Sequence, residues 1–365
     1  MTTEFTGVAA TDVPALVNGC LPHYLNGKEF ETVLEYQNYL FIDELFAKNR
    51  RRVGGGKAVE HRYILDTNGS FRHTALVSPR GRYDHNTSVL VAYEPWKHYD
   101  FYADYEERTM TMMSSGKELY DYMKAQFFMG FASAANGLEA AAAGRPEDSN
   151  DSETPWGFPM WVRGVPAGTT DYDGGWNGAT AYYDDGTGTS TVNNIALGSY
   201  SKLHNWAANH TGFNADLFDK IIRGRVMSNY VPPKMPHMPK KMGGERVILW
   251  SMEYEAKYRQ LLNRWFADGR NQDASPFAAN AASKLQGSRT IGLATLNSDA
   301  LEHVYDIDFG NFQSLVLGKW WLKANPAEKV PGFATLWKVD VLGSYAYIAR
   351  NLRTVGAAYH LPRSS

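Results

Sequence analysis

Hydrophobic residues spaced three and four positions apart predict one long helix over residues 116–143. Ser115 and Glu118 form a Ser-x-x-Glu capping box at its start, in which each side chain accepts a hydrogen bond from an otherwise unpaired backbone N–H. Gly144 and Pro146 end the helix. At about 1.5 Å per residue it is roughly 40 Å long, a length that suits a structural strut. The expected apolar face consists of Tyr120, Met123, Phe127, Phe131, Ala134, Ala135 and Leu138.

A second helix is expected over residues 28–48, where apolar residues occupy one broad face. Arg50, Arg51 and Arg52 follow this helix and precede a run of glycines. The sequence leaves three interpretations of the basic run open: a helix end in water, a contact with nucleic acid, or a contact with carboxylates of a neighbouring molecule. Residues 1–27 show no periodicity and are expected to form an extended arm.

Alternating residues over 59–66 predict a β-strand, which Asn68-Gly69 separates from a second strand over 71–78. Asn-Gly between two strands favours a type I′ turn, because both central residues then need positive φ. Both faces of this hairpin mix charged and apolar residues, so it needs a surface to lie on. That surface belongs either to its own domain or to an adjacent subunit. The expected register pairs Asp66 with Phe71, Ile64 with His73 and Arg62 with Ala75.

The rest of the chain is interpreted as strands around a glycine-rich α/β region. The polar, acidic residues 145–153 are the best candidate for a domain boundary. Asn214 is the expected N-cap of a helix over 214–223, and the proline-rich residues 231–241 are expected to be an extended loop. A strand followed by a helix, at 246–252 and 253–268, is typical of a small α/β unit. Further strands are expected over 88–93, 98–105, 304–309, 312–322, 333–341 and 345–359.

Strands therefore both precede the long helix and close the chain. One sheet built from these distant segments and packed on the helix would bury all the apolar faces. The glycine-rich α/β region is then an insertion within that domain.

Composition narrows the class of protein. The chain has 365 residues, a formal net charge of −2 and 44% hydrophobic residues. This is enough for about two domains with buried cores, and the charge gives no case for strong nucleic-acid binding. Cys20 is the only cysteine, so no internal disulfide can form. The first residues lack an apolar signal core, and no apolar run reaches the roughly 18 residues of a membrane span.

A search for catalytic or ligand-binding motifs finds none. Gly186 and Gly188 lack the third glycine of a dinucleotide fingerprint. His204 and His210 are six residues apart, which on a helix separates their directions by about 120° and does not suit a metal. Four aspartates could gather a cation, although turn formation beside glycine is the commoner explanation. These are Asp171, Asp173, Asp184 and Asp185.

We therefore expect no catalytic residue, no cofactor and no metal site. A pair of glycosidase carboxylates that are distant in the sequence stays open, because spacing alone does not reveal it.

The order of these elements resembles the major capsid proteins of tailed bacteriophages, whose fold is shared with encapsulins and some archaeal and herpes-type viral shells. The resemblance implies an α+β, HK97-like capsid fold with four parts: an N-terminal arm, an E-loop hairpin, a peripheral (P) domain of spine helix and antiparallel sheet, and an axial (A) domain. The expected segments are 1–52 for the arm and helix, 53–85 for the E-loop hairpin, 86–148 for the first part of the P-domain, 149–302 for the A-domain and 303–365 for the closing strands of the P-domain.

The same resemblance implies a structural subunit and not an enzyme. Such a subunit assembles into pentamers and hexamers that form an icosahedral shell around double-stranded DNA, in the host cytoplasm and then in the virion. The implied partners are further copies of the chain, a separate scaffolding protein, a portal, possible decoration proteins and non-specifically contacted DNA, with no membrane. The expected inter-subunit contact residues are Arg50, Arg51, Arg52, Lys57, Glu60, Arg62, Asp66, Asn68, Gly69 and Arg72.

Some relatives crosslink a hairpin lysine to an asparagine of a neighbour. Lys57 lies near the corresponding place, but no motif identifies an asparagine partner, so we expect no crosslink. Two alternative functions remain at this point. Tryptophans and tyrosines among Gly, Asp and Asn at 156–200 suit a carbohydrate-active enzyme or glycan-binding protein, and an encapsulin-like compartment would enclose an enzyme instead of DNA.

Overall fold

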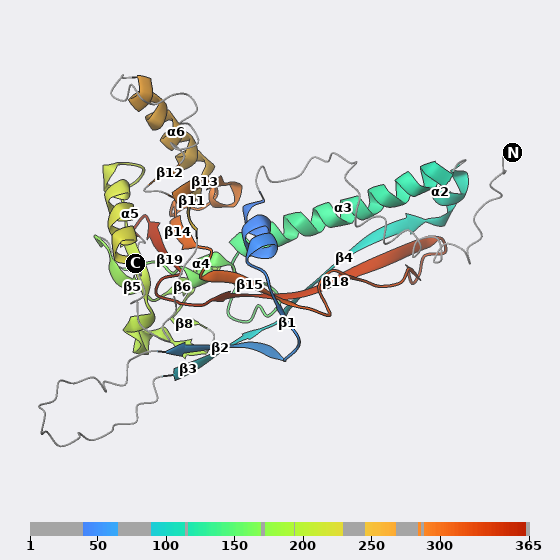
Figure 1. Cartoon of the computed structure of the whole chain (residues 1–365), viewed down its shortest axis with the longest axis horizontal. Coiled ribbons are helices and arrows are strands. Elements are labelled where there is room, and N and C mark those ends of the chain that lie inside the picture. Colours follow the sequence, from blue (N-terminus) through green and yellow to red (C-terminus); the bar gives the residue numbers. More distant parts are fainter. Residues whose placement is uncertain are drawn as a thin grey trace, which may run out of the picture. The chain divides into compact units, whose positions relative to one another are not determined.

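The computed structural model describes most of the chain as two compact units (Figure 1). Each unit combines segments that are far apart in the sequence, and each is considered by itself below. The described residues are 39–64, 89–113, 116–168, 172–192, 194–228, 245–267, 284–285 and 288–362. The smaller unit takes its described residues from 39–55, 96–141 and 315–345, and the larger unit takes them from 56–95, 142–314 and 346–362.

The smaller unit is a sheet packed against one long helix, as the apolar spacing predicts. Helix α3 (Gly116–Ala143) has the expected bounds. Met123 and Phe127 of α3 are buried in one cluster with Phe101 of strand β4 (Lys97–Glu106) and Val339 of strand β18 (Leu336–Ala349). Figure 1 shows α3 running along these two strands.

Strands β4 and β18 form the longest strand pair of this unit. They run antiparallel in an unbroken register from Glu106 opposite Leu336 to Lys97 opposite Tyr345. Gly130 of α3 lies where the helix approaches β4 most closely: a Cβ atom there would lie 3.1 Å from the carbonyl oxygen of Tyr102. A larger side chain would therefore push the helix away from the strand.

The remaining elements of the smaller unit complete the sheet and lead into α3. Strand order is β1–β15–β18–β16, and β4 and β17 also pair with β18. Helix α2 joins β4 to the start of α3. The bounds are β1 (Arg51–Val53), β15 (Phe312–Leu317), β16 (Lys323–Ala324), β17 (Glu328–Lys329), α2 (Glu107–Met112) and the π-helical segment η1 (Ile42–Lys48).

The prediction of two closing strands at 333–341 and 345–359 was wrong about where the chain turns. β18 continues through Gly343, and the break comes after Ala349, before β19 (Gly356–His360). Gly343 serves packing and not a turn, because a Cβ atom there would lie 2.1 Å from the ring of Tyr99 on β4. A glycine in a strand often marks such a close approach.

The larger unit contains a seven-stranded mixed sheet in the order β12–β13–β11–β14–β19–β10–β5. β11 and β13 are parallel and joined through helix α6, which confirms the predicted α/β unit. Buried side chains of helices α5 and α6 pack in one cluster with alternate residues of β10, β11 and β19. The bounds are β5 (Gly175–Gly178), β10 (Asn205–Asn209), α5 (Ala215–Ser228), β11 (Arg246–Ser251), α6 (Met252–Ala267), β12 (Lys284–Leu285), β13 (Ser288–Leu293) and β14 (Val304–Asp308).

Helix α5 begins as predicted. The Oδ1 atom of Asn214 accepts a hydrogen bond from the backbone N–H of Leu217 at 3.3 Å, which is the geometry of an N-cap. Short elements fill the glycine-rich region. Their bounds are α4 (Phe158–Trp161), β6 (Ala181–Tyr182), β7 (Gly188–Thr189), β8 (Thr191–Val192), β9 (Ile195–Ala196), η2 (Leu197–Ser199), η3 (Ser201–Leu203) and η5 (Ala294–Leu296).

Several expectations lie outside the described residues. These are the arm at 1–27, the helix before residue 39, the Ser115 side of the capping box, the turn at Asn68-Gly69 and the loop at 231–241. The part of the 28–48 helix that the structure describes is helical.

A carboxylate of α3 fixes the start of that helical segment. Glu139 is 3% exposed, and its Oε1 and Oε2 atoms accept hydrogen bonds from the backbone N–H groups of Phe41 and Ile42, both at 3.1 Å. The hydroxyl of Tyr39 also donates to Asn136. Burial raises the pKa of Glu139 to about 7, although the two N–H donors act in the opposite direction. Glu139 therefore caps a helix start that lies far from it in the sequence.

We expect Glu139→Ala to lower the free energy of unfolding by about 1–3 kcal/mol, because it leaves two buried N–H groups unpaired. Urea unfolding at pH 8, where the carboxylate is ionised, measures the change. Asp121→Ala removes the same charge from an exposed position of α3 and is the control. Equal stability of the two variants would contradict the capping role.

Candidate functional site

The hairpin formed by β2 (Ala58–Ile64) and β3 (Val89–Pro95) has two different faces. On β2, Val59 and Tyr63 are 8% and 5% exposed, whereas Glu60, Arg62 and Ile64 are exposed. This alternation follows from the two-residue period of a strand. The inner face therefore packs on the larger unit, and the outer face lies in solvent.

Two hydrogen bonds attach the inner face to the end of β18 and the residue after it. The hydroxyl of Tyr63 donates to the carbonyl oxygen of Ala349 at 2.6 Å, and Nε2 of His61 lies 3.0 Å from the carbonyl oxygen of Arg350. The rings of His61 and Tyr63 pack edge to face. Burial raises the pKa of Tyr63, so its hydroxyl stays protonated and donates at any physiological pH. The base of the hairpin is thus held in one position.

The outer face carries apolar side chains that nothing in the described part of the chain covers. Ile64, Val89 and Tyr93 are 77%, 51% and 44% exposed. Ile64 lies directly opposite Val89 in the pair of strands, and Glu60 lies opposite Tyr93. Glu60 and Arg62 are charged neighbours of these residues, and exposed apolar patches with a polar rim are typical of surfaces that bind another molecule.

The register predicted across Asn68-Gly69, with Ile64 opposite His73 and Arg62 opposite Ala75, lies outside the described residues. Within the described residues, Ile64 pairs with Val89 and Arg62 with Val91, a pairing that was not predicted. Which segment pairs with a strand depends on which one can bury a matching face. Leu90 and Ala92 of β3 supply such a face opposite Tyr63 and His61. The second strand expected at 71–78 lies outside the described residues.

The structure places the other predicted contact residues as follows. Arg50, Arg51 and Arg52 are all exposed in the smaller unit, where the helix has already ended at Lys48 and Arg51–Val53 form β1. Lys57, Glu60 and Arg62 are exposed in the larger unit. Asp66, Asn68, Gly69 and Arg72 lie outside the described residues.

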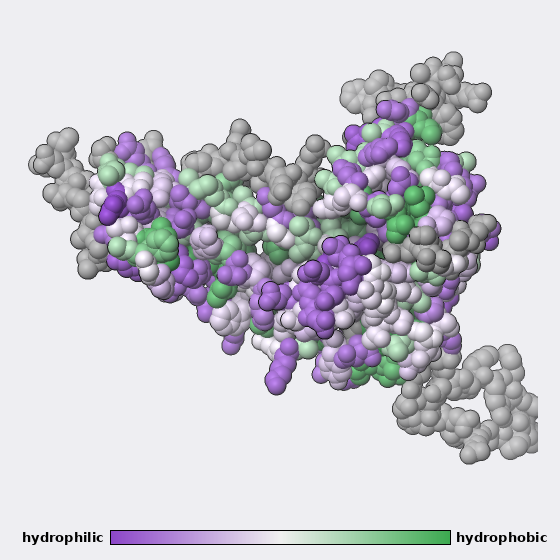
Figure 2. Space-filling view, turned by 180° about the vertical axis from the view of Figure 1, so that it is seen from behind, coloured by the Kyte–Doolittle hydropathy of each residue, from purple (hydrophilic) through white to green (hydrophobic). Residues whose placement is uncertain are grey.

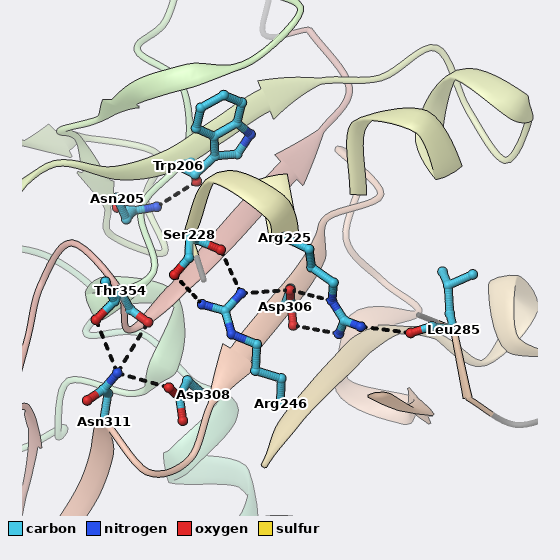
Figure 3. Close-up of polar contacts among 10 residues, drawn as sticks. All are labelled: Asn205, Trp206, Arg225, Ser228, Arg246, Leu285, Asp306, Asp308, Asn311 and Thr354. Atoms are coloured by element: carbon cyan, nitrogen blue, oxygen red, sulfur yellow. Dashed lines mark hydrogen bonds and ion pairs between the residues drawn. The ribbon is translucent and has the colours of Figure 1, made fainter. Parts of the chain in front are cut away.

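A buried ionic cluster in the larger unit was not predicted (Figure 3). Asp306 of β14 is fully buried and accepts from Arg225 of α5 in a bidentate pair, at 3.0 Å and 3.1 Å, and from Arg246 of β11 at 3.2 Å. The second acceptors are Ser228, whose Oγ lies 2.6 Å from Arg246, and the carbonyl oxygen of Leu285, 2.7 Å from Arg225. The cluster joins α5, β11, β12 and β14.

The sequence did contain a signal for this cluster. Asp306 interrupts an apolar strand, and a buried carboxylate needs a cation beside it. The sequence does not show which arginines approach Asp306, because Arg225 and Arg246 lie on other elements and are brought to it only by the tertiary fold. Two guanidinium groups share one carboxylate, and main-chain carbonyl oxygens satisfy their remaining N–H groups.

We expect Asp306→Asn to lower the free energy of unfolding by about 3–5 kcal/mol, because it leaves the buried Arg225 and the partly buried Arg246 without their counter-charge. Asp219→Asn, at an exposed position of α5, makes the same chemical change and is the control. Thermal and urea unfolding measure both variants. A loss below about 1 kcal/mol for Asp306→Asn would show that the cluster is not needed for stability.

Two buried histidines at one end of the same sheet are held in the neutral form. Nδ1 of His210 accepts the N–H of Gly212 at 3.1 Å, so Nε2 carries the proton and donates to the carbonyl oxygen of Glu302 at 3.0 Å. Nε2 of His360 accepts the N–H of Val165 at 2.9 Å. Protonation would destroy both acceptor sites, because a backbone N–H cannot accept.

His204 and His210, weighed above as a metal pair, are therefore packed histidines with backbone partners; His204 contacts the carbonyl oxygen of Leu197 at 2.9 Å. Within the described residues, no three His, Cys, Asp or Glu side chains are grouped to hold a metal ion. Asp184 and Asp185 lie in a turn with Thr187, and Asp173 lies 3.8 Å from Lys220. Asp171 is outside the described residues.

We expect acid to destabilise the larger unit through His210. Burial lowers the pKa of His210 below its ordinary value of 6.5, so below pH 6.5 the unfolded chain takes up a proton that the folded chain does not. The free energy of unfolding therefore decreases as the pH is lowered, by on the order of 1 kcal/mol between pH 7 and pH 5. Urea unfolding at both pH values measures it.

His210→Gln should reduce this pH dependence, and His98→Gln, at an exposed histidine of β4, should leave it unchanged. A pH dependence that is the same in all three proteins would contradict the assignment. Because His210→Gln also alters packing, the comparison is made on the slope with pH and not on the absolute stability.

Taken together, the helix on its sheet, the inserted α/β unit and the hairpin define an α+β fold of the HK97-like capsid class. The structure is similar to the capsid of a native GTA particle, with 12% sequence identity and a TM-score of 0.52, over 92% of this chain and 95% of that chain. It is also similar to the capsid of cyanophage A-1(L), with 9% identity and a TM-score of 0.56, over 92% and 94%. No family model and no curated protein matches the sequence.

Two further findings concern the described residues. None of their helices is long and apolar enough to span a membrane. Figure 2 shows polar and apolar residues interspersed in small patches over the face that it draws.

Proposed function

We propose that this chain is the structural subunit of an icosahedral capsid of the tailed-phage and GTA type. In this role it is not an enzyme; it assembles into pentamers and hexamers that enclose double-stranded DNA in the virion. The similarity of fold over 92% of the chain is the observation that supports this most strongly. A separate scaffolding protein, a portal and decoration proteins are the further partners that we propose.

The hairpin gives this proposal a physical reason. Its inner face is fixed on its own unit, and its outer face leaves Ile64, Val89 and Tyr93 in water. Burying apolar area is worth about 25 cal/mol per Å², so covering this face with a second copy is favourable. In closed symmetric rings each copy both gives and receives such a contact, and modest contacts add up around the ring. We assign Lys57, Glu60 and Arg62 to the same contact.

The alternative function, a carbohydrate-active enzyme or glycan-binding protein, was based on the tryptophans and tyrosines at 156–200, and the positions of the tryptophans do not favour it. Trp161 is fully buried, Trp156 packs against it, and Trp176 packs between Trp206 and the guanidinium of Arg353. Trp161 therefore lies in the interior of the larger unit, and Trp156 and Trp176 are partly buried against other side chains, whereas a glycan-binding platform presents its aromatic rings to solvent. An encapsulin-like compartment shares the fold and is distinguished by its contents.

We expect Ile64→Asp to abolish shells without unfolding the subunit, because it places a charge in the proposed contact while residue 64 is exposed in the single chain. Ile64→Val keeps the site apolar and is the matched control, which should assemble normally. Electron microscopy and sedimentation measure assembly, and circular dichroism measures folding. Normal shells from Ile64→Asp would remove the hairpin from the contact, and a wild-type chain that stays a 40.9 kDa monomer at all concentrations would contradict the capsid function.

A further inference from the structure

Five exposed cations lie on neighbouring segments of the smaller unit, and we call this region the basic surface. Arg50 directly precedes β1, Arg51 and Arg52 begin it, Lys319 lies in the turn after β15, and Lys323 begins β16. β1 pairs with β15, and the N–H of Gly318 donates to the carbonyl oxygen of Val53 at 2.9 Å. The basic run and the lysine turn are therefore neighbours in space, although more than 250 residues separate them in the sequence.

Two tryptophans in this turn fix where the cations lie. Trp321 stacks on Phe46 at 5.1 Å, and the guanidinium of Arg50 lies 5.8 Å from its ring centre. Trp320 points to solvent, 42% exposed, and Nζ of Lys323 lies 4.2 Å from its ring centre. Cation–π contacts of this kind hold a cation in place without neutralising it.

The basic surface also lacks counter-charges. None of its five cations forms an ion pair with a carboxylate in the part of the chain that the structure describes. Other basic residues do form them, such as Lys220 with Asp216 and Lys338 with Asp340. Strand alternation places Arg50 and Arg52 on one side of β1 and Arg51 on the other. Positive charge thus surrounds the edge of the sheet and remains available to an external anion.

We propose that the basic surface binds the phosphate backbone of double-stranded DNA; the inference rests on the proposed capsid function. A protein partner would need an apolar centre depleted of lysine, but here Lys323 lies 4.2 Å from the centre of the exposed Trp320 ring. Interfaces with DNA are instead polar and strongly positive. Several exposed cations without a shaped pocket suit contacts to phosphates, which are independent of base sequence.

The net charge of −2 limits how tightly one subunit can hold DNA. Each phosphate that a cation neutralises makes the slope of log K against log salt concentration more negative by about 0.9. The basic surface therefore supplies a weak, salt-sensitive contact that repeats in every copy of a shell. This arrangement positions DNA along the protein and still lets it move during filling and release.

The test uses the purified full-length chain below its assembly concentration and a fluorescent 30-bp duplex of arbitrary sequence. Fluorescence anisotropy from 50 to 200 mM salt gives Kd and its slope. We expect Arg50→Gln/Arg52→Gln and Lys319→Gln/Lys323→Gln each to weaken binding about fivefold and to reduce the slope by about 1–2. Arg108→Gln/Arg223→Gln changes net charge equally at exposed positions elsewhere and should bind like the wild type.

Three results would overturn the inference: wild-type affinity in both basic-surface variants, equal weakening in the control, or polyglutamate binding to the basic surface as tightly as DNA. Shell formation is scored in parallel by electron microscopy. Loss of shells in the basic-surface variants alone would assign the surface to a contact between copies and overturn DNA binding, while the capsid function stands. Absence of shells in every protein, wild type included, would contradict the capsid function itself.

Discussion

The burial of α3 on the β4–β18 pair is the interaction on which the smaller unit depends. It joins residues 97–106, 116–143 and 336–345, which no local interaction would bring together, into one apolar layer centred on Phe101, Phe127 and Val339. Residues 142–314 then belong to the second unit, which has its own buried charges and a sheet that also includes β19. The N-terminal segment joins the same layer through Glu139, whose carboxylate meets the start of the Leu40–Lys48 helix.

The two exposed surfaces described above, the outer face of the hairpin and the basic surface, differ in chemistry. The outer face of the hairpin is apolar with a charged rim, whereas the basic surface is cationic, with Lys323 beside the exposed ring of Trp320. Apolar area is best matched by another folded protein surface, and exposed cations are best matched by phosphates. The two proposed contacts, one with copies of the chain and one with DNA, therefore rest on surfaces of different chemistry.

The sequence predicted the elements in which apolar residues recur at the period of a helix or strand. It did not predict features that depend on contacts between distant segments. The bounds of α3, the Asn214 cap and the order of strand β11 followed by helix α6 were predicted from spacing and local chemistry. The pairing of β2 with β3 was not predicted, because it depends on Leu90 and Ala92, which lie far along the chain from Tyr63 and His61. The break expected between 341 and 345 is absent, because Gly343 continues β18 and makes room for Tyr99. The Arg225–Asp306–Arg246 cluster joins three distant segments. Its only signal in the sequence is the aspartate within an apolar strand. Of the ten predicted contact residues, the structure describes six, all exposed; their partners stay a prediction.

The attachment of the hairpin has a consequence for how such sequences diverge. Tyr63 and His61 both meet main-chain oxygen atoms, those of Ala349 and Arg350. A peptide carbonyl is present whatever side chain follows, so substitutions at 349 and 350 leave the acceptors intact. The acceptor of each hydrogen bond therefore does not depend on which side chain stands at that position. Acceptors of this kind are compatible with a fold retained at 9–12% sequence identity to the similar capsid structures.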